Sequence, residues 1–90
     1  GGTFAFMVTP NPAQSQIEIT FEDSEEMISY FETKSEVLEV EISNLLSEKK
    51  YKGVINKNGM TIDVSKIPTG LYIVKVTGKS YHETARLIIE

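Results

Sequence analysis

Apolar and polar residues alternate in short runs along most of this chain. The clearest run is Val37–Ser43, where every second residue from Leu38 to Ile42 is aliphatic and glutamates stand between. Alternation with a period of two places one set of side chains on each face of a β-strand, which is typical of a strand that covers a core with one face. The pattern predicts seven strands, over the ranges Thr3–Thr9, Gln16–Phe21, Val37–Ser43, Lys49–Ile55, Met60–Val64, Leu71–Thr77 and Tyr81–Ile89.

Turn-forming residues separate the predicted strands. The segment Pro10–Pro12 lacks two backbone donors and so predicts the end of the first strand. Asn56–Gly59 predicts a turn, because asparagine and glycine tolerate positive φ, and Gly78–Lys79 predicts a two-residue type II′ hairpin. Seven strands with short connections in 90 residues predict one domain, residues 1–90, folded as an all-β, immunoglobulin-like antiparallel β-sandwich.

The segment Glu22–Glu36 breaks this rhythm. Met27, Tyr30 and Phe31 follow the i, i+3, i+4 spacing of a helix, and acidic residues precede them as they do at helix starts. The spacing predicts a short helix within residues 23–33. An extended segment that adds an edge strand fits the same residues, and the sequence leaves both alternatives open.

Composition supports the strand prediction and adds a charge asymmetry. Valine, isoleucine and threonine supply 25 residues, against five leucines and three alanines, which favours strands over helices. Residues 1–48 hold ten acids and one base, whereas residues 49–90 hold eight bases and three acids, within a net charge of −4. A nucleic-acid binder concentrates positive charge with little opposing it, so the sequence argues against that class. The two halves either face each other or serve separate partners.

No residues form a recognisable catalytic or metal-binding pattern. Ser80 and His82 share one face of an extended segment, but no acid is placed to orient the imidazole. The acidic run 22–26 lacks the Asp/Asn-Gly spacing of a calcium loop and is predicted to be a solvated helix start. Cysteines, glycine-rich phosphate loops and apolar runs of about 20 residues are absent. The sequence therefore predicts no enzyme activity, cofactor, metal, small-molecule substrate or membrane span.

Three segments, in order along the chain, resemble the motifs of one known family. Val8–Ala13 (VTPNPA) resembles an opening YPNPA motif, Thr61–Val76 is similar to an IDLSxLPxGxYxVKV block, and Ala85–Glu90 resembles a KKLIV-like terminus. Over residues 8–90 the chain thus resembles the type A C-terminal sorting domain of the type IX secretion system, also called the Por secretion system. The resemblance implies these family-motif residues: Pro10, Asn11, Pro12, Ala13, Asp63, Gly70, Tyr72, Lys75, Arg86, Leu87, Ile88 and Ile89.

The resemblance implies a function and a set of partners. A domain of this family would end a larger exported protein and direct it, without catalysis, through the periplasm and the type IX translocon to the cell surface or the medium. Its partners would be translocon proteins and a sortase-like peptidase. The translocon would recognise a folded surface, chiefly the strand Ala85–Ile89 and the block Gly70–Val76. The alternative is a stand-alone secreted immunoglobulin-like domain that acts in adhesion or protein interaction through the acidic segment 22–36 or an exposed edge strand.

Some of these motif residues have physical roles that any sandwich could use. Pro10 and Pro12 are expected to protect a sheet edge, because proline cannot donate to a further strand. Gly70 is expected to allow a tight approach into the following strand, and Tyr72 to form a tyrosine corner with its hydroxyl bonded to the preceding turn. The chain departs from the family at residues 43–48 (SNLLSE), which replace a DLTGR-like turn and contain no glycine.

Overall fold

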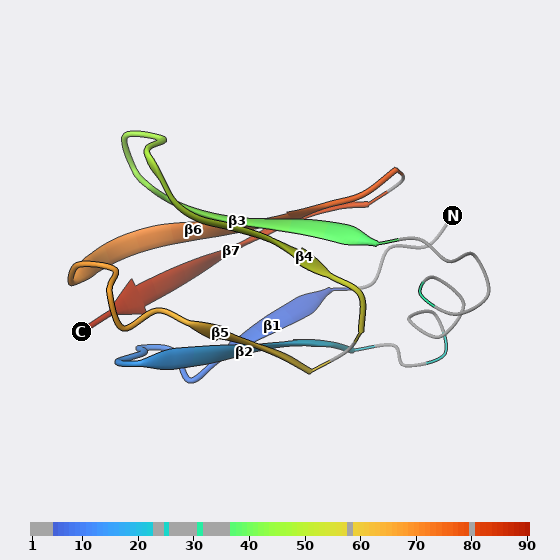
Figure 1. Ribbon diagram of the computed structural model, residues 1–90, viewed down its shortest axis with the longest axis horizontal. Coiled ribbons are helices and arrows are strands. Elements are labelled where there is room, and N and C mark those ends of the chain that lie inside the picture. Colours follow the sequence, from blue (N-terminus) through green and yellow to red (C-terminus); the bar gives the residue numbers. More distant parts are fainter. Residues whose placement is uncertain (1–4, 23–24, 26–30, 32–36, 58, 80) are drawn as a thin grey trace.

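Seven β-strands in the described part of the chain form two antiparallel sheets that pack face to face (Figure 1). The computed structural model describes residues 5–22, 25, 31, 37–57, 59–79 and 81–90. The smaller sheet has the strand order β1-β2-β5, and the larger sheet has the order β4-β3-β6-β7. The strands are β1 (Phe6–Thr9), β2 (Gln16–Phe21), β3 (Leu38–Asn44), β4 (Lys49–Ile55), β5 (Met60–Asp63), β6 (Gly70–Thr77) and β7 (His82–Ile89).

The order of the strands is that of an immunoglobulin-like sandwich. After β1 and β2 pair in one sheet and β3 and β4 in the other, the chain returns with β5 to the first sheet and with β6 and β7 to the second. In constant-type immunoglobulin domains the fourth strand joins the sheet of the first two, whereas here β4 stays beside β3. The predicted all-β sandwich is confirmed, and six of the seven predicted strands agree with the observed ends to within one residue.

The alternation in the sequence becomes the burial pattern of the strands. In β2 the side chains of Ile17, Ile19 and Phe21 are buried, while those between them are exposed or half-buried. Burial of one large aliphatic or aromatic side chain contributes roughly 1.5–3 kcal/mol, so the space between the sheets supplies most of the stability. The buried apolar residues are Phe6, Val8, Ala13, Ile17, Ile19, Phe21, Leu38, Val40, Ile42, Ile55, Ile62, Val64, Tyr72, Val74, Val76, Tyr81, Leu87 and Ile89.

Two residues of the predicted helix, 23–33, belong to the described part of the chain. Glu25 is exposed, and Phe31 is half-buried against the core. The rings of Phe31 and Phe21 are T-shaped with centroids 6.2 Å apart, and Tyr81 meets Phe21 in the same way at 6.2 Å. Phe31 therefore packs against the interior; Glu25 and Phe31 are both helical in conformation, whereas the extent of a helix or an edge strand lies outside the described residues.

The predicted type II′ hairpin at Gly78–Lys79 is wrong. Thr77 pairs with His82, and the Gly78 N–H donates to the carbonyl of Tyr81 at 2.8 Å. Gly78 thus continues the ladder and does not occupy the first loop position that the predicted turn requires. This register places Tyr81 in the core, where its side chain is only 3% exposed.

A β-bulge sets the direction of the charged side chains where β3 meets β4. The pairing register shifts after Ile42, and Ser43 lies opposite Lys49, so Lys50 is the extra residue. An extra residue reverses the alternation beyond it, because side chains along a strand have a period of two. Lys49 therefore lies on the outer face of the larger sheet, beside Glu41, instead of pointing into the core.

Asn44 holds the turn between β3 and β4. Its Oδ1 accepts the backbone N–H groups of Leu46 and Glu48, each at 2.9 Å, and its Nδ2 donates to Glu48 Oε1 at 2.7 Å. Ser47 has a left-handed φ of 65° and donates its N–H to the Asn44 carbonyl at 3.0 Å. Within residues 43–48, Ser47 thus takes a left-handed conformation that glycine adopts without strain.

Replacement of Ser47 by glycine is expected to stabilise the domain. A side chain in the left-handed region is strained, so Ser47→Gly should raise the free energy of unfolding by about 0.5–1 kcal/mol. Urea denaturation measures this change. The matched control is Ser43→Gly in β3, which should lower the free energy by a similar amount, because glycine weakens a strand interior. Destabilisation by Ser47→Gly would contradict the expectation.

Candidate functional site

The first family motif lies against the free edge of the last strand. β7 pairs with β6 on one side only, which leaves the backbone groups of its other side to find partners. The Asn11 Nδ2 donates to the Arg86 carbonyl at 2.9 Å, and the Asn11 Oδ1 accepts the Ile88 N–H at 3.0 Å. The Ala13 N–H donates to the Ile88 carbonyl at 2.8 Å, and the Ala13 carbonyl accepts the Glu90 N–H at 2.8 Å. We call these four hydrogen bonds the clasp.

The residue types of the motif explain why the clasp forms. The chain bends at Pro10–Pro12, where the Thr9–Pro10 and Asn11–Pro12 peptide bonds are both cis, and this bend lies where the Asn11 amide reaches the backbone of β7. Pro10 and Pro12 are exposed and carry no N–H, which is why this segment offers little to a further strand. Ala13 is fully buried, and its small side chain fits where the segment forms a parallel bridge with Ile89.

The start of β6 supports β7 from the other side. Gly70 pairs with Ile89 and Tyr72 pairs with Leu87. The predicted tyrosine corner is present, because the Tyr72 hydroxyl donates to the Pro68 carbonyl at 2.6 Å. A Cβ at Gly70 would meet the Tyr72 ring at 3.6 Å, an ordinary contact, so the expected tight approach is not what requires glycine; the φ of 159° is a conformation that other residues rarely adopt. The corner fixes where β6 begins, and β6 in turn fixes β7.

Asp63 acts at a distance from the clasp, in the connection between β5 and β6. Its Oδ1 accepts the Ser65 N–H at 2.8 Å and so forms a turn after β5. Hydrogen bonds from the Ser65 side chain and backbone hold the pKa of the Asp63 carboxyl below its usual value. Asp63 therefore stabilises the start of the β5–β6 connection, which also contains Pro68, the residue whose carbonyl accepts the Tyr72 hydroxyl.

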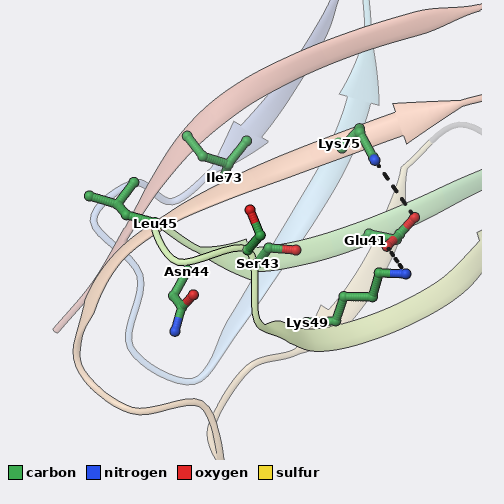
Figure 2. A pocket seen from close by; sticks show the side chains of 8 residues that line it. Glu41, Ser43, Asn44, Leu45, Lys49, Ile73 and Lys75 are labelled. Atoms are coloured by element: carbon green, nitrogen blue, oxygen red, sulfur yellow. Dashed lines mark ion pairs between the residues drawn. The ribbon is translucent and has the colours of Figure 1, made fainter.

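Lys75 lies on the outer face of the larger sheet, in an ion-pair cluster with Glu41 (Figure 2). The Lys49 Nζ lies 3.2 Å from Glu41 Oε2, and the Lys75 Nζ lies 4.0 Å from Glu41 Oε1. The Glu41 side chain is only 12% exposed. The ion pair with Lys49, together with the charges of Lys75 and Lys52, holds the pKa of Glu41 below its usual value although burial opposes this. Acids of the first half and bases of the second half thus face each other here.

The structure brings most of the predicted motif residues to one place. Asn11 and Ala13 hydrogen-bond the backbone of 86–90, and Gly70 and Tyr72 pair with the same strand. Pro10 and Pro12 flank the clasp, whereas Asp63 and Lys75 lie elsewhere.

Sequence reasoning missed two features beside this assembly. Alternation over Val37–Ser43 predicts that Glu41 points away from the core, but it identifies neither Lys49 nor Lys75 as its partner. The exposed leucines at the tip of the β3–β4 turn, Leu45 and Leu46, were noted only as a departure from the family turn. Two adjacent leucines in a turn were the available signal for the second feature, because a turn normally carries polar residues there.

Neither of the weighed chemical sites gains support from the part of the chain that is described. His82 is exposed on β7, while Ser80 lies outside the described residues, as do Asp23 and Glu26 of the acidic run. No group of three or more His, Asp or Glu side chains among the described residues is placed to hold a metal ion. Within those same residues, no helix is long and apolar enough to cross a membrane.

Removal of the clasp side chain is expected to loosen the last strand. Asn11→Ala removes two hydrogen bonds and should lower the free energy of unfolding by about 1–2 kcal/mol. Amide hydrogen exchange should show lost protection at Ile88, whose N–H bonds to Asn11, with little change at Val74 in the centre of β6. Gln14→Ala, an exposed amide in the same segment, is the matched control. Unchanged protection at Ile88 would show that the two Asn11 hydrogen bonds do not stabilise the last strand.

Stability is expected to fall in acid because of Glu41. Its pKa is lower in the folded than in the unfolded chain, so the unfolded chain takes up the proton first. The contribution of Glu41 is therefore fully present above its ordinary pKa of 4.5 and is lost as the pH falls through the lower folded value. Glu41→Gln should flatten the dependence of the unfolding free energy on pH in this acid range. Glu39→Gln, which removes a carboxylate that forms no ion pair among the described residues, is the control; equal flattening by both variants would contradict the assignment.

A comparison with family models places this geometry in a known group. The model described as the secretion system C-terminal sorting domain matches residues 7–90, which run from β1 through β7. A comparison with curated proteins gives no match. The matched region holds the clasp, the tyrosine corner and the last strand, so the resemblance drawn from the three sequence motifs is confirmed. The chain belongs to the family of C-terminal sorting domains of the type IX secretion system.

Proposed function

We propose that this domain is a non-catalytic sorting signal that directs an exported protein through the type IX translocon to the cell surface or the medium. The observation that carries the proposal is the family match over residues 7–90. The match makes the chain a sorting domain of a secretion system, and such domains serve export. The proposal goes beyond the family match in three respects: the non-catalytic action, the route through the periplasm and the final location.

The clasp supports recognition of a folded surface. Asn11 and Ile88 are 77 residues apart in the sequence, yet their hydrogen bond holds the first and last motifs together. A linear peptide signal would need no such contact, because an unfolded segment presents only its own residues. The proposed signal is therefore a folded surface of the sandwich, chiefly the strand Ala85–Ile89 and the block Gly70–Val76.

The proposal assigns partners by class. The domain would sit at the end of a larger exported protein, contact translocon proteins during passage and be removed by a sortase-like peptidase at the surface. Its motif residues would act through shape and contact, since none of Pro10, Asp63 or Arg86 belongs to a catalytic arrangement in the described residues. The family resemblance is what supports these partners.

A reporter fusion tests the proposal. The 90 residues are fused to the C-terminus of a periplasmic reporter in a host that carries the type IX system, and reporter activity is measured in the medium, on intact cells and in the periplasm. Activity is expected outside the outer membrane. The same fusion in a translocon-deficient strain is the control and should stay in the periplasm. A folded, full-length fusion that remains periplasmic in the competent host would overturn the proposal.

A further inference from the structure

Apolar side chains gather on the outer face of the larger sheet, at the end where β6 begins and β7 finishes. Four of them are exposed by 40% or more: Leu45 by 65%, Leu46 by 80%, Leu71 by 40% and Ile88 by 44%. Ile73 is half-buried in the same region. We call the five residues the apolar patch. Scattered exposed aliphatic side chains need no explanation, but a contiguous set often marks a contact surface.

Strand register and a shared depression connect Leu45, Leu71, Ile73 and Ile88, and Leu46 follows Leu45 in the exposed turn. Leu71 lies opposite Ile88 on neighbouring strands, and Ile73 lies two residues further along β6 on the same face. Leu45 reaches this face from the β3–β4 turn, where it and Ile73 line one depression of about 300 Å³ (Figure 2). The patch therefore extends from the turn across β6 to β7.

The turn presents its leucines in a fixed position. The hydrogen bonds that Asn44 makes to Leu46 and Glu48 close the turn, and the turn bends away from the smaller sheet (Figure 1). A surface that is already ordered loses little conformational entropy when it binds. Exposed leucines on such a turn favour a binding role, because they bury little apolar surface in the core and so contribute little to folding stability.

Cations border the apolar patch. Arg86 lies beside Ile73 in the sheet, and Lys75 and Lys49 lie along the side toward Glu41. Glu41 is the acid that lines the depression, and both of its oxygens already face lysines. Glu48 in the turn adds a second acid, so Lys49, Lys75 and Arg86 against Glu41 and Glu48 leave the border positive by one charge, which complements an acidic partner.

We propose that the apolar patch and its basic border bind an acidic, leucine-rich segment of a protein of the secretion machinery. The partner's place in that machinery rests on the proposed function, whereas its chemistry rests on the patch itself. Side chains of Ser43 and Ser47 in the depression offer hydrogen-bonding groups that suit a peptide better than acyl chains. If two copies of this chain met through the apolar patch, Lys75 and Arg86 of one copy would approach Lys75 and Arg86 of the other. The repulsion between these cations opposes self-association.

Binding is measured by NMR on the 15N-labelled domain with a synthetic peptide of twelve alternating glutamates and leucines. Saturable shift changes are expected at Leu45, Ile73 and Ile88, and little change at Val54, which is exposed on the same sheet near its other end. The matched peptide with glutamine in place of glutamate should bind about tenfold more weakly or worse. Equal shifts with both peptides, or no shifts on this face, would overturn the proposal.

Substitutions in the apolar patch and in its basic border test the peptide contact. Leu45→Ser and Arg86→Gln should each weaken peptide binding by about tenfold, whereas Val54→Ser should leave it unchanged. Leu45 lies in an exposed turn, so its replacement leaves the core intact.

Stronger binding to phosphatidylglycerol vesicles than to the peptide would overturn the proposal in favour of a membrane. Shift changes at the patch that grow with domain concentration alone would overturn it in favour of a dimer.

The reporter fusion separates this proposal from the proposed function. Export of the parent fusion and of the Val54→Ser fusion, with retention of the Leu45→Ser fusion, is the expected result. Retention of the parent fusion, while the purified domain binds the acidic peptide as expected, overturns the proposed function and supports the surface. Export of the parent and Leu45→Ser fusions at the same level overturns the surface as a contact with the secretion machinery.

Discussion

The clasp between residues 11–13 and the last strand is the contact on which the rest of this structure depends. β7 is an edge strand, and an edge strand with free backbone groups is open to further pairing. The Asn11 side chain supplies an acceptor and a donor in the places where a neighbouring strand would have its own carbonyl and N–H. Ala13 continues the pairing with its backbone. The Asn11 side chain and the Ala13 backbone thus occupy the hydrogen-bonding positions that a further strand beside β7 would fill.

The clasp also joins the two sheets. β1 belongs to the smaller sheet, and the residues that follow it cross to the edge of the larger one. A chain that pairs with both sheets restrains their separation, as does the buried Tyr72, whose hydroxyl holds the preceding turn. The position of β7 is consequently determined by three contacts: pairing with β6, the clasp, and burial of Leu87 and Ile89. Pairing with β6 is a hairpin between consecutive strands, whereas the clasp joins residues at opposite ends of the sequence.

This distinction explains what the sequence could predict. Alternation identified the strands, because the burial of Ile17, Ile19 and their counterparts is a local pattern with a period of two. The hydroxyl bond of Tyr72 was also accessible, since its partner lies four residues away. The partner of Asn11 was not, because Ile88 lies 77 residues away in the sequence. The pairing of Glu41 with Lys49 depends on the bulge at Lys50, which alternation alone does not predict. The hairpin prediction at Gly78 failed because Gly78 bonds to Tyr81 and so continues the ladder, which turn preference alone did not indicate.

The clasp limits how a partner can contact this end of the domain. Addition of a partner strand to β7 requires free backbone groups, and along Arg86–Glu90 the Arg86 carbonyl, the Ile88 N–H and carbonyl and the Glu90 N–H are all occupied. The inner side chains of β7 are buried in the core. The outer side chains, Arg86 and Ile88, are what remains for contact, and they lie in one surface with Leu71 and Ile73. The feature that protects the edge therefore directs recognition to the outer face.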